Sequence, residues 1–158
     1  MENQDIRIVT LPPMRVVSFY AFGSSPETAA WDKLVLWAKS HACWQDAPAT
    51  RIFGFNNPDP SAGSPNYGYE FWLTVGPEVQ ADSDNATKDF PGGLYAALLC
   101  NVSGDPWEVI PTAWSKLVKW RESSHYQFGN HQWLEELHTR HESNDKGFVL
   151  DLYMPIIE

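Results

Sequence analysis

The sequence predicts an α+β fold made of two copies of one βαββ unit, and two internal similarities carry this prediction. The segment AWDKLVLWAK at 30–39 returns as AWSKLVKWRE at 113–122, and the strand-like YEFWLTV at 69–75 returns as LDLYMPI at 150–156. Each half then has the order strand, helix, strand, strand. A repeat of this size rarely buries its apolar face alone, so we expect antiparallel sheets in two halves that pack together with pseudo-two-fold symmetry.

Length and composition fit a single globular domain. The chain has 158 residues, of which 43% are hydrophobic and 20% charged, and this is enough for one domain over 1–158 with a core of its own. We expect the first repeat at about 6–77, a polar linker at about 78–90 and the second repeat at about 91–157. The 8 Trp residues suggest an aromatic surface that is partly open, because an indole carries a polar N–H that needs a partner.

Charge and hydropathy exclude two classes of partner. The formal net charge is −9 and no basic stripe is present to neutralise phosphates, so we expect no nucleic acid as a partner. No apolar run is long enough to span a membrane, and the N-terminal segment lacks the apolar stretch of a secretory signal. We therefore expect a cytoplasmic protein in which Cys43 and Cys100 are reduced.

Local chemistry sets the element boundaries in the first half. Residues 6–23 are strand-like, but a Pro-Pro pair at 12–13 removes two ladder donors and divides the segment into two short strands. A helix should begin at Pro26 after a serine cap. Its apolar stripe consists of Trp31, Leu34, Val35 and Ala38. Strands are expected at 50–55 and 67–75, with a turn rich in Asn, Pro, Gly and Ser between them.

The second half repeats this order with one ambiguous element. We expect a strand at 94–104, a helix capped by Asp105, and a last strand at 147–156 that Pro155 ends. The segment HQWLEELHTRH at 131–141 has the composition of a helix, but its position in the repeat is that of a strand. Both interpretations stay open.

The candidate site follows from the alternation of side chains along the strand at 67–75. One face is uniformly apolar and should lie under the helix, while the other carries Glu70 and Trp72. Asp151 and Tyr153 take the corresponding positions in the last strand. A carboxylate among aromatic rings loses hydration, so its pKa should rise, and it could then hold a cation or act as a general base. For Asp151 a plainly solvated side chain fits equally well.

The two interpretations of the segment at 131–141 predict different candidate sites. As a strand, it places Trp133 and Glu135 on one face, where they would repeat the indole–carboxylate pair. Glu136 then lies on the opposite face, where a solvated side chain is the simpler interpretation, although Glu136 stays among the candidate ligand-binding residues. As a helix, the segment holds a single ExxH pair of Glu135 and His138, which falls short of a di-iron site. We therefore expect no metal and no cofactor.

Five segments together resemble the GyrI-like small-molecule-binding superfamily, which is also the effector-binding half of multidrug-responsive transcription regulators. They are YGYEFWLTV, FPGGLYAALL, the twin AWxKLVxW helices, QWLEEL and the closing DLYMPI. The resemblance extends from Ile6 to Ile157 and implies a duplicated βαββ fold with a ligand cleft between the halves. It also implies that aromatic side chains around a buried glutamate bind bulky aromatic, often cationic compounds. Glu70 and Glu135 are the positions that match this glutamate.

The resemblance implies a stand-alone binding protein for multidrug recognition, without the DNA-binding part of the regulators. One alternative is detoxification by a hydrolase that opens cyclopropane-bearing alkylating compounds, with Glu70 or Glu135 activating water and Tyr95 or Tyr69 donating a proton. Tyr69 is the weaker of the two donors, because alternation puts it on the core face. A second alternative is inhibition of a protein partner such as a topoisomerase. The candidate ligand-binding residues are Trp72, Trp133, Tyr153, Tyr69, Phe90 and Glu136.

Overall fold

Strands and helices follow one another in the order expected for a duplicated βαββ unit, and the α+β class is confirmed. The computed structural model describes residues 6–41, 50–57, 59, 61–77, 79, 86–138 and 148–158. The chain divides into two units: one comprises 14–90, and the other joins 1–13 to 91–158. Neither helix in the described part of the chain is long and apolar enough to cross a membrane.

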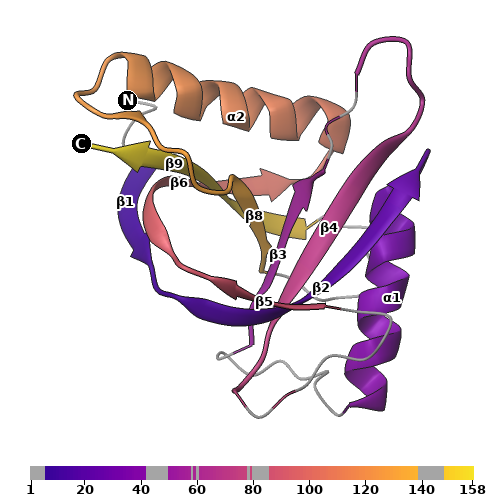
Figure 1. Cartoon of the computed structure of the whole chain (residues 1–158). Helices are drawn as coiled ribbons and strands as arrows, with labels where there is room; N and C mark the ends of the chain where they lie inside the picture. The colour runs from indigo at the N-terminus through magenta and orange to yellow at the C-terminus, as the bar shows by residue number, and fades with distance from the viewer. Residues whose placement is uncertain are drawn as a thin grey trace. The chain divides into compact units, whose positions relative to one another are not determined.

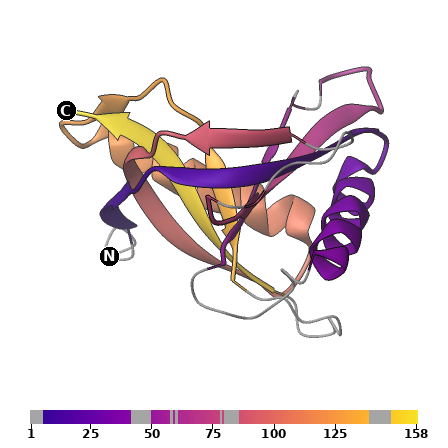
Figure 2. The ribbon, with the colours of Figure 1, turned by 60° about the horizontal axis from the view of Figure 1, so that its bottom comes forward.

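The unit of residues 14–90 is a four-stranded antiparallel sheet with one helix. Its elements are β2 (Met14–Gly23), α1 (Pro26–Ser40), β3 (Ile52–Asn56), β4 (Tyr67–Thr74) and β5 (Ala86–Phe90). The strands are ordered β3-β4-β2-β5, and Figure 2 shows β5 directly beside β2. Helix α1 packs on β2 and β4 (Figure 1).

The position of α1 follows from its sequence. Pro26 occupies the first turn, Glu27 lies near the positive end of the helix and Lys39 near the negative end. The face on the sheet differs slightly from the expected stripe, because Trp31 and Val35 are only half-buried. The buried residues of the helix are Pro26, Ala30, Leu34, Trp37 and Ala38.

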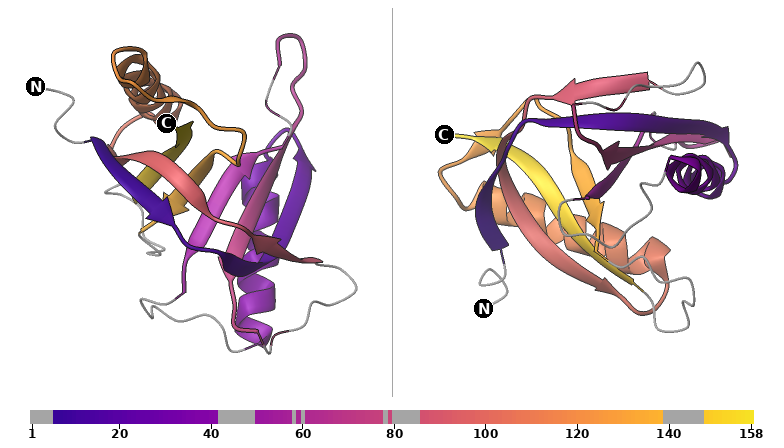
Figure 3. Two further views of the ribbon diagram at one scale, coloured as in Figure 1. Left: turned by 60° about the vertical axis from the view of Figure 1, so that its left-hand side comes forward. Right: turned by 90° about the horizontal axis from the view of Figure 1, so that it is seen from below.

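The other unit repeats this architecture. Its elements are β1 (Ile6–Leu11), β6 (Gly93–Val102), α2 (Pro106–Glu122), β7 (Gln127–Phe128), β8 (Leu134–Leu137) and β9 (Phe148–Ile157). The strands are ordered β1-β6-β9-β8, and β7 adds to the end of β9. Figure 3 shows α2 against β6 and β9. The Asp105 carboxylate caps α2 by accepting a hydrogen bond from the Trp107 backbone N–H, at 3.0 Å.

The strand that leads into each repeat pairs with the other repeat. β1 ends just before Pro12 and pairs with β6, whereas β5 ends just before Pro91 and pairs with β2. Residues 86–90, which the sequence analysis assigned to the linker, are therefore an edge strand of the first unit's sheet. Their polar composition suits an edge strand, because only part of such a strand is covered.

Two expectations about the second half are resolved. The ambiguous segment at 131–141 contains strand β8, which pairs with β9. The strand expected from its position in the repeat is therefore correct, and the helix expected from its composition is not. The expectation that Pro155 ends the last strand is wrong, because β9 continues to Ile157. The Pro155 carbonyl accepts a hydrogen bond from the Gly129 N–H at 3.0 Å, so the missing Pro N–H is on that side and not toward β6.

The faces of the long strands alternate as expected. The apolar face of β9 joins β6 and α2 in a core formed by Ala96, Leu98, Cys100, Val102, Ala113, Leu117, Leu150, Leu152, Met154 and Ile156. Cys100 is a free, buried thiol whose pKa is raised by burial; Cys43 lies outside the described residues. The opposite face of β9 carries Asp151, and the corresponding face of β4 carries Glu70.

Candidate functional site

Glu70 is the buried acid of the first unit. It lies in the middle of β4 on the face opposite Phe71, and the Phe71 ring contacts Trp31 of α1 at 5.3 Å between centroids. Glu70 is 2% exposed. A carboxylate so far removed from water is costly unless hydrogen bonds replace its hydration.

Four donors from the surrounding strands replace that hydration. Oε2 of Glu70 accepts hydrogen bonds from Ser18 Oγ at 2.6 Å, Trp72 Nε1 at 2.7 Å and Lys88 Nζ at 2.6 Å. Oε1 accepts one from Asn57 Nδ2 at 3.2 Å. The donors come from β2, β4, β5 and the residue after β3.

This network keeps Glu70 ionised. Burial alone would raise the pKa of the Glu70 carboxyl, but the hydrogen bonds from Lys88, Ser18, Trp72 and Asn57 together outweigh burial and lower the pKa below its ordinary value of 4.5. The expectation of a raised pKa is therefore wrong. That expectation considered the loss of water but did not include the hydrogen bonds from Lys88, Ser18 and Asn57.

Aromatic rings pack around the Glu70–Trp72 pair. Trp72 meets Phe55 edge-on, with ring centroids 4.9 Å apart, and meets Phe90 at 5.5 Å. All three rings are at least nine-tenths buried. Phe90, which the sequence analysis named separately, thus lies in one cluster with the Glu70–Trp72 pair.

A cavity of about 500 Å³ opens beside Glu70. Its lining consists of Ser18, Tyr20, Lys33, Asn57, Glu70, Ala86 and Lys88. Tyr20 is the aromatic member of this lining, whereas Trp72 contacts Glu70 but does not line the cavity. Lys33 is held at the rim, since its Nζ donates to the Tyr20 carbonyl at 2.7 Å. The cavity is thus more polar than the ring-lined pocket expected from the sequence.

The two candidate phenols lie elsewhere. Tyr69 is on the helix-facing side of β4, where its ring packs edge-on against Phe71 with centroids 4.9 Å apart. Tyr95 is fully buried, donates its hydroxyl hydrogen to the Gln132 carbonyl at 2.6 Å, and has its pKa raised by burial. The proton of Tyr95 is thus engaged in a structural hydrogen bond and its ionisation is disfavoured.

A second acid cluster lies in the other unit. Glu136 of β8 and Asp151 of β9 are direct cross-strand partners, and they are 6% and 4% exposed. The Tyr153 hydroxyl donates to Glu136 Oε1 at 2.6 Å, and Arg7 of β1 forms an ion pair with Asp151 Oδ1. Together with His138, the two acids form a group of potential metal ligands whose ligating atoms lie within 4.8 Å of one another. Asp151 is therefore a buried, paired acid and not a solvated one.

Glu135 and Trp133 face away from this cluster. Glu135 Oε2 accepts a hydrogen bond from Trp114 Nε1 of α2 at 3.3 Å. Trp133 is 37% exposed and packs against Trp114 and Phe128, with centroids 5.5 and 5.7 Å away. Glu135 thus meets an indole of the helix, and it is Glu136 that shares a face with Asp151.

Sequence reasoning missed the donors around both acids. Lys88 and Arg7 lie on the edge strands β5 and β1, and their acids lie on strands that are not adjacent to these edges. Asn57 stood in a stretch that was interpreted only as a turn. Ser18 carried a usable signal, because it is a lone polar residue at the centre of an apolar strand.

Comparison with known proteins identifies relatives of the whole chain. The profile of a family described as "Cass2: Integron-associated effector binding protein" matches residues 7–156. No curated protein sequence matches the chain.

Solved structures share the fold at low identity. The C-terminal domain of EcmrR aligns over 97% of both chains with 14% identity and a TM-score of 0.69. In the EcmrR–DNA complex the chain spans only 57% of the EcmrR chain, aligning over 97% of its own length with 12% identity and a TM-score of 0.72. A hydrolase from Listeria innocua aligns over 98% of this chain and 92% of its own, with 12% identity and a TM-score of 0.69. SAV2435 bound to tetraphenylphosphonium aligns over 98% and 94%, with 9% identity and a TM-score of 0.55.

Proposed function

Because the chain belongs to the Cass2 family of integron-associated effector-binding proteins, we propose that it captures bulky aromatic cations in the cavity beside Glu70. Small-molecule binding is the property that an effector-binding family has in common. The observation that carries the finer proposal is the Glu70 carboxylate, which is 2% exposed, stays ionised and borders the cavity.

The charge of Glu70 supports a cationic ligand. A carboxylate with a lowered pKa keeps its negative charge at all pH values near neutrality. In a site with little water, the attraction between such a charge and a cation is stronger than in bulk solvent. The aromatic wall at Tyr20 adds a cation–π or stacking contact of about 0.5–2 kcal/mol.

Lys88 acts as an internal counterion that the ligand replaces. Its ammonium lies 2.6 Å from Glu70 Oε2, yet its side chain is 46% exposed whereas that of Glu70 is 3% exposed. A lysine stem is long and flexible, so the ammonium can move into water when a ligand cation takes its place. Glu70 would keep its hydrogen bonds from Ser18, Trp72 and Asn57 in that exchange.

Hydrolysis of a cyclopropane by Glu70-activated water fits these contacts less well. A general base works best with a pKa near the working pH, and the pKa of Glu70 is shifted the other way. Tyr95, the candidate proton donor, is committed to the Gln132 carbonyl. The structural similarity to a Listeria hydrolase, at 12% sequence identity, indicates only that the two proteins share a fold. No contact in the described part of the chain favours a topoisomerase partner, so that role is not part of the proposal.

Calorimetric titration with tetraphenylphosphonium tests the proposal. We expect saturable binding by the wild-type protein and a loss of at least tenfold in affinity in Glu70→Gln. Asp89→Asn is the matched control: it changes the net charge equally, its side chain is 87% exposed, and it should bind as the wild type does. Equal affinities of the wild type and Glu70→Gln would overturn the proposal. Mass spectrometry of a cyclopropane-bearing alkylator incubated with the protein tests for turnover separately.

A further inference from the structure

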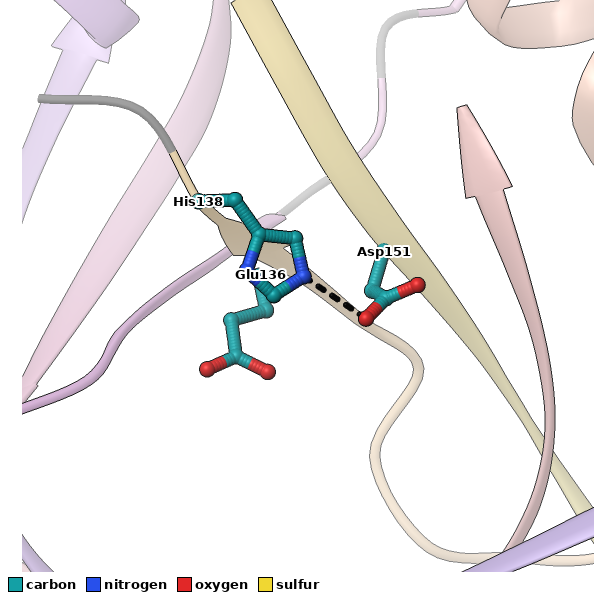
Figure 4. Close-up of side chains that lie close together, drawn as sticks. All are labelled: Glu136, His138 and Asp151. Carbon is teal, nitrogen blue, oxygen red and sulfur yellow. Dashed lines mark hydrogen bonds and ion pairs between the residues drawn. The ribbon is translucent and has the colours of Figure 1, made fainter. Parts of the chain in front are cut away.

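A compact group of metal-ligating side chains lies on β8, on the residue that follows it and on β9, in the unit that does not contain Glu70. Glu136 and His138 are two residues apart, so both point to the same face, and Asp151 is the direct cross-strand neighbour of Glu136. Figure 4 shows the His138 ring turned toward the Asp151 carboxylate, while the Glu136 carboxylate beside them points in another direction. The backbone holds this arrangement, because the His138 N–H donates to the Val149 carbonyl at 3.0 Å.

We propose that Glu136, His138 and Asp151 bind a divalent transition-metal ion of the zinc type. An imidazole nitrogen and two carboxylate oxygens suit zinc, cobalt, nickel and manganese better than calcium or magnesium, which prefer oxygen alone. Three protein ligands leave further coordination positions for water or for a ligand, which is typical of open metal sites.

The distances require only a small adjustment. The ligating atoms of the three residues lie within 4.8 Å of one another, and His138 Nε2 is 2.7 Å from Asp151 Oδ2. Atoms bound to one zinc ion at about 2.0–2.2 Å lie roughly 3–3.5 Å from each other in a tetrahedral arrangement. The His138–Asp151 pair must therefore open slightly and the Glu136 carboxylate must approach, which a glutamate achieves by rotating its side chain.

Neighbouring side chains orient the carboxylates of Glu136 and Asp151 by hydrogen bonds, as the neighbours of metal ligands do. Tyr153 donates to Glu136 Oε1 at 2.6 Å, which orients that carboxylate. Arg7 contacts Oδ1 of Asp151, whereas His138 contacts Oδ2, so the guanidinium orients the carboxylate without occupying the oxygen that faces the imidazole. The two acids and Arg7 leave one net negative charge, which attracts a cation.

The same contacts have a second explanation that needs no metal ion: Arg7 and His138 neutralise two buried acids. Metal titration separates the two. The side chain of His138 is 42% exposed, so a His138→Gln variant should fold, and it removes a ligand while leaving both acids and Arg7 in place. Near-UV circular dichroism checks the fold of each variant.

The experiment is calorimetric titration of ZnCl₂ into tag-free, chelator-treated protein, repeated with CoCl₂ while the visible absorption of the cobalt ion is followed. We expect one equivalent of zinc to bind to the wild type, a loss of at least tenfold in affinity in His138→Gln and in Glu136→Gln, and cobalt bands that disappear in both. Glu135→Gln and His125→Gln are matched controls and should bind as the wild type does. Absence of stoichiometric binding, or wild-type affinity in His138→Gln, would overturn the proposal. Tetraphenylphosphonium binding should be unchanged in His138→Gln, so this result is independent of the Glu70 proposal.

Discussion

Trp72 and Tyr153 occupy equivalent positions on β4 and β9, and each donates a hydrogen bond to a buried carboxylate. Trp72 Nε1 is 2.7 Å from Oε2 of Glu70, and the Tyr153 hydroxyl is 2.6 Å from Oε1 of Glu136. The acids differ, since Glu70 lies on the same strand as its donor and Glu136 on the neighbouring strand. Duplication has kept an aromatic donor in each unit, while the groups around it have diverged: a lysine and an amide in one unit, and an arginine and a histidine in the other.

Replacing Trp72 by Phe should weaken the site without removing its aromatic packing. The change keeps a ring beside Phe55 and Phe90 but leaves Glu70 Oε2 without its indole donor. A hydrogen bond to a charged group contributes about 1.5–3 kcal/mol, so we expect the free energy of unfolding to fall by about that amount. Urea denaturation measures it. A loss below about 0.5 kcal/mol would mean that the indole N–H is not a significant partner of Glu70.

Removing Lys88 should strengthen cation binding. In Lys88→Gln the ammonium that competes for Glu70 Oε2 is gone, so a ligand cation no longer has to displace it. We expect the affinity for tetraphenylphosphonium to rise by roughly three- to tenfold, or up to about 1.4 kcal/mol. Arg15→Gln on neighbouring β2 removes the same charge from a side chain outside the cavity lining, and should change the affinity little. An unchanged or weaker affinity in Lys88→Gln would contradict the counterion role.

The lowered pKa of Glu70 gives the stability a defined dependence on pH. A carboxyl whose pKa is lower in the folded state than its ordinary value of 4.5 stabilises the fold above pH 4.5, and this contribution disappears as the pH falls through the folded pKa. The difference in unfolding free energy between the wild type and Glu70→Gln should therefore be constant from about pH 5 to 7 and shrink below pH 4.5. If this free-energy difference grows as the pH falls, the effect of burial on the Glu70 pKa outweighs that of its hydrogen bonds.

Tyr67 should make the stability sensitive to alkali. Burial and the nearby Glu27 carboxylate raise the pKa of Tyr67 to about 12, and its hydroxyl donates to both Glu27 oxygens at 2.7 Å. A raised pKa stabilises the fold fully below pH 10, and the contribution is lost as the pH rises toward 12. Because burial also raises the pKa of Tyr95, phenolate absorbance should show one late-titrating tyrosine fewer in Tyr67→Phe than in the wild type. An unchanged number of late-titrating tyrosines in the variant would contradict the raised pKa of Tyr67.

The close contact of Gly54 with Tyr69 predicts a stability effect that leaves ligand binding unaffected. A Cβ at Gly54 would overlap the Tyr69 ring, so Gly54→Ala should destabilise the protein by roughly 1–3 kcal/mol. Gly104→Ala is the control, because nothing lies within 4 Å of its added Cβ. Thermal denaturation compares the two variants. If Tyr69 belongs to the core and not to the site, folded Gly54→Ala should bind tetraphenylphosphonium as the wild type does.

Strand alternation was sufficient to bring Glu70 and Trp72 together, because residues two apart on a strand always share a face. The duplication likewise predicted the equivalence of β4 with β9, and it favoured a strand at β8 as one of two interpretations that stayed open. These inferences rest on local periodicity and on the repeat, and both are present in the chain itself.

The remaining features depend on pairing between distant segments. The contact of Lys88 with Glu70 requires β5 to lie beside β2, and a polar stretch such as 86–90 carries no pattern that predicts it. The sign of the Glu70 pKa shift depends on those same contacts. In β8, a shift of one residue exchanges the faces, and the indole of Trp114 that meets Glu135 comes from α2, so the sequence could not tell whether Glu135 or Glu136 joins Asp151.

A crystal structure of the protein with tetraphenylphosphonium tests the central claim most directly. The account predicts that the phosphonium occupies the cavity next to Glu70, with a phenyl group against Tyr20, and that the Lys88 ammonium has left Glu70 Oε2 for solvent. A phosphonium bound elsewhere, with the Glu70–Lys88 contact intact at its present 2.6 Å, would contradict it.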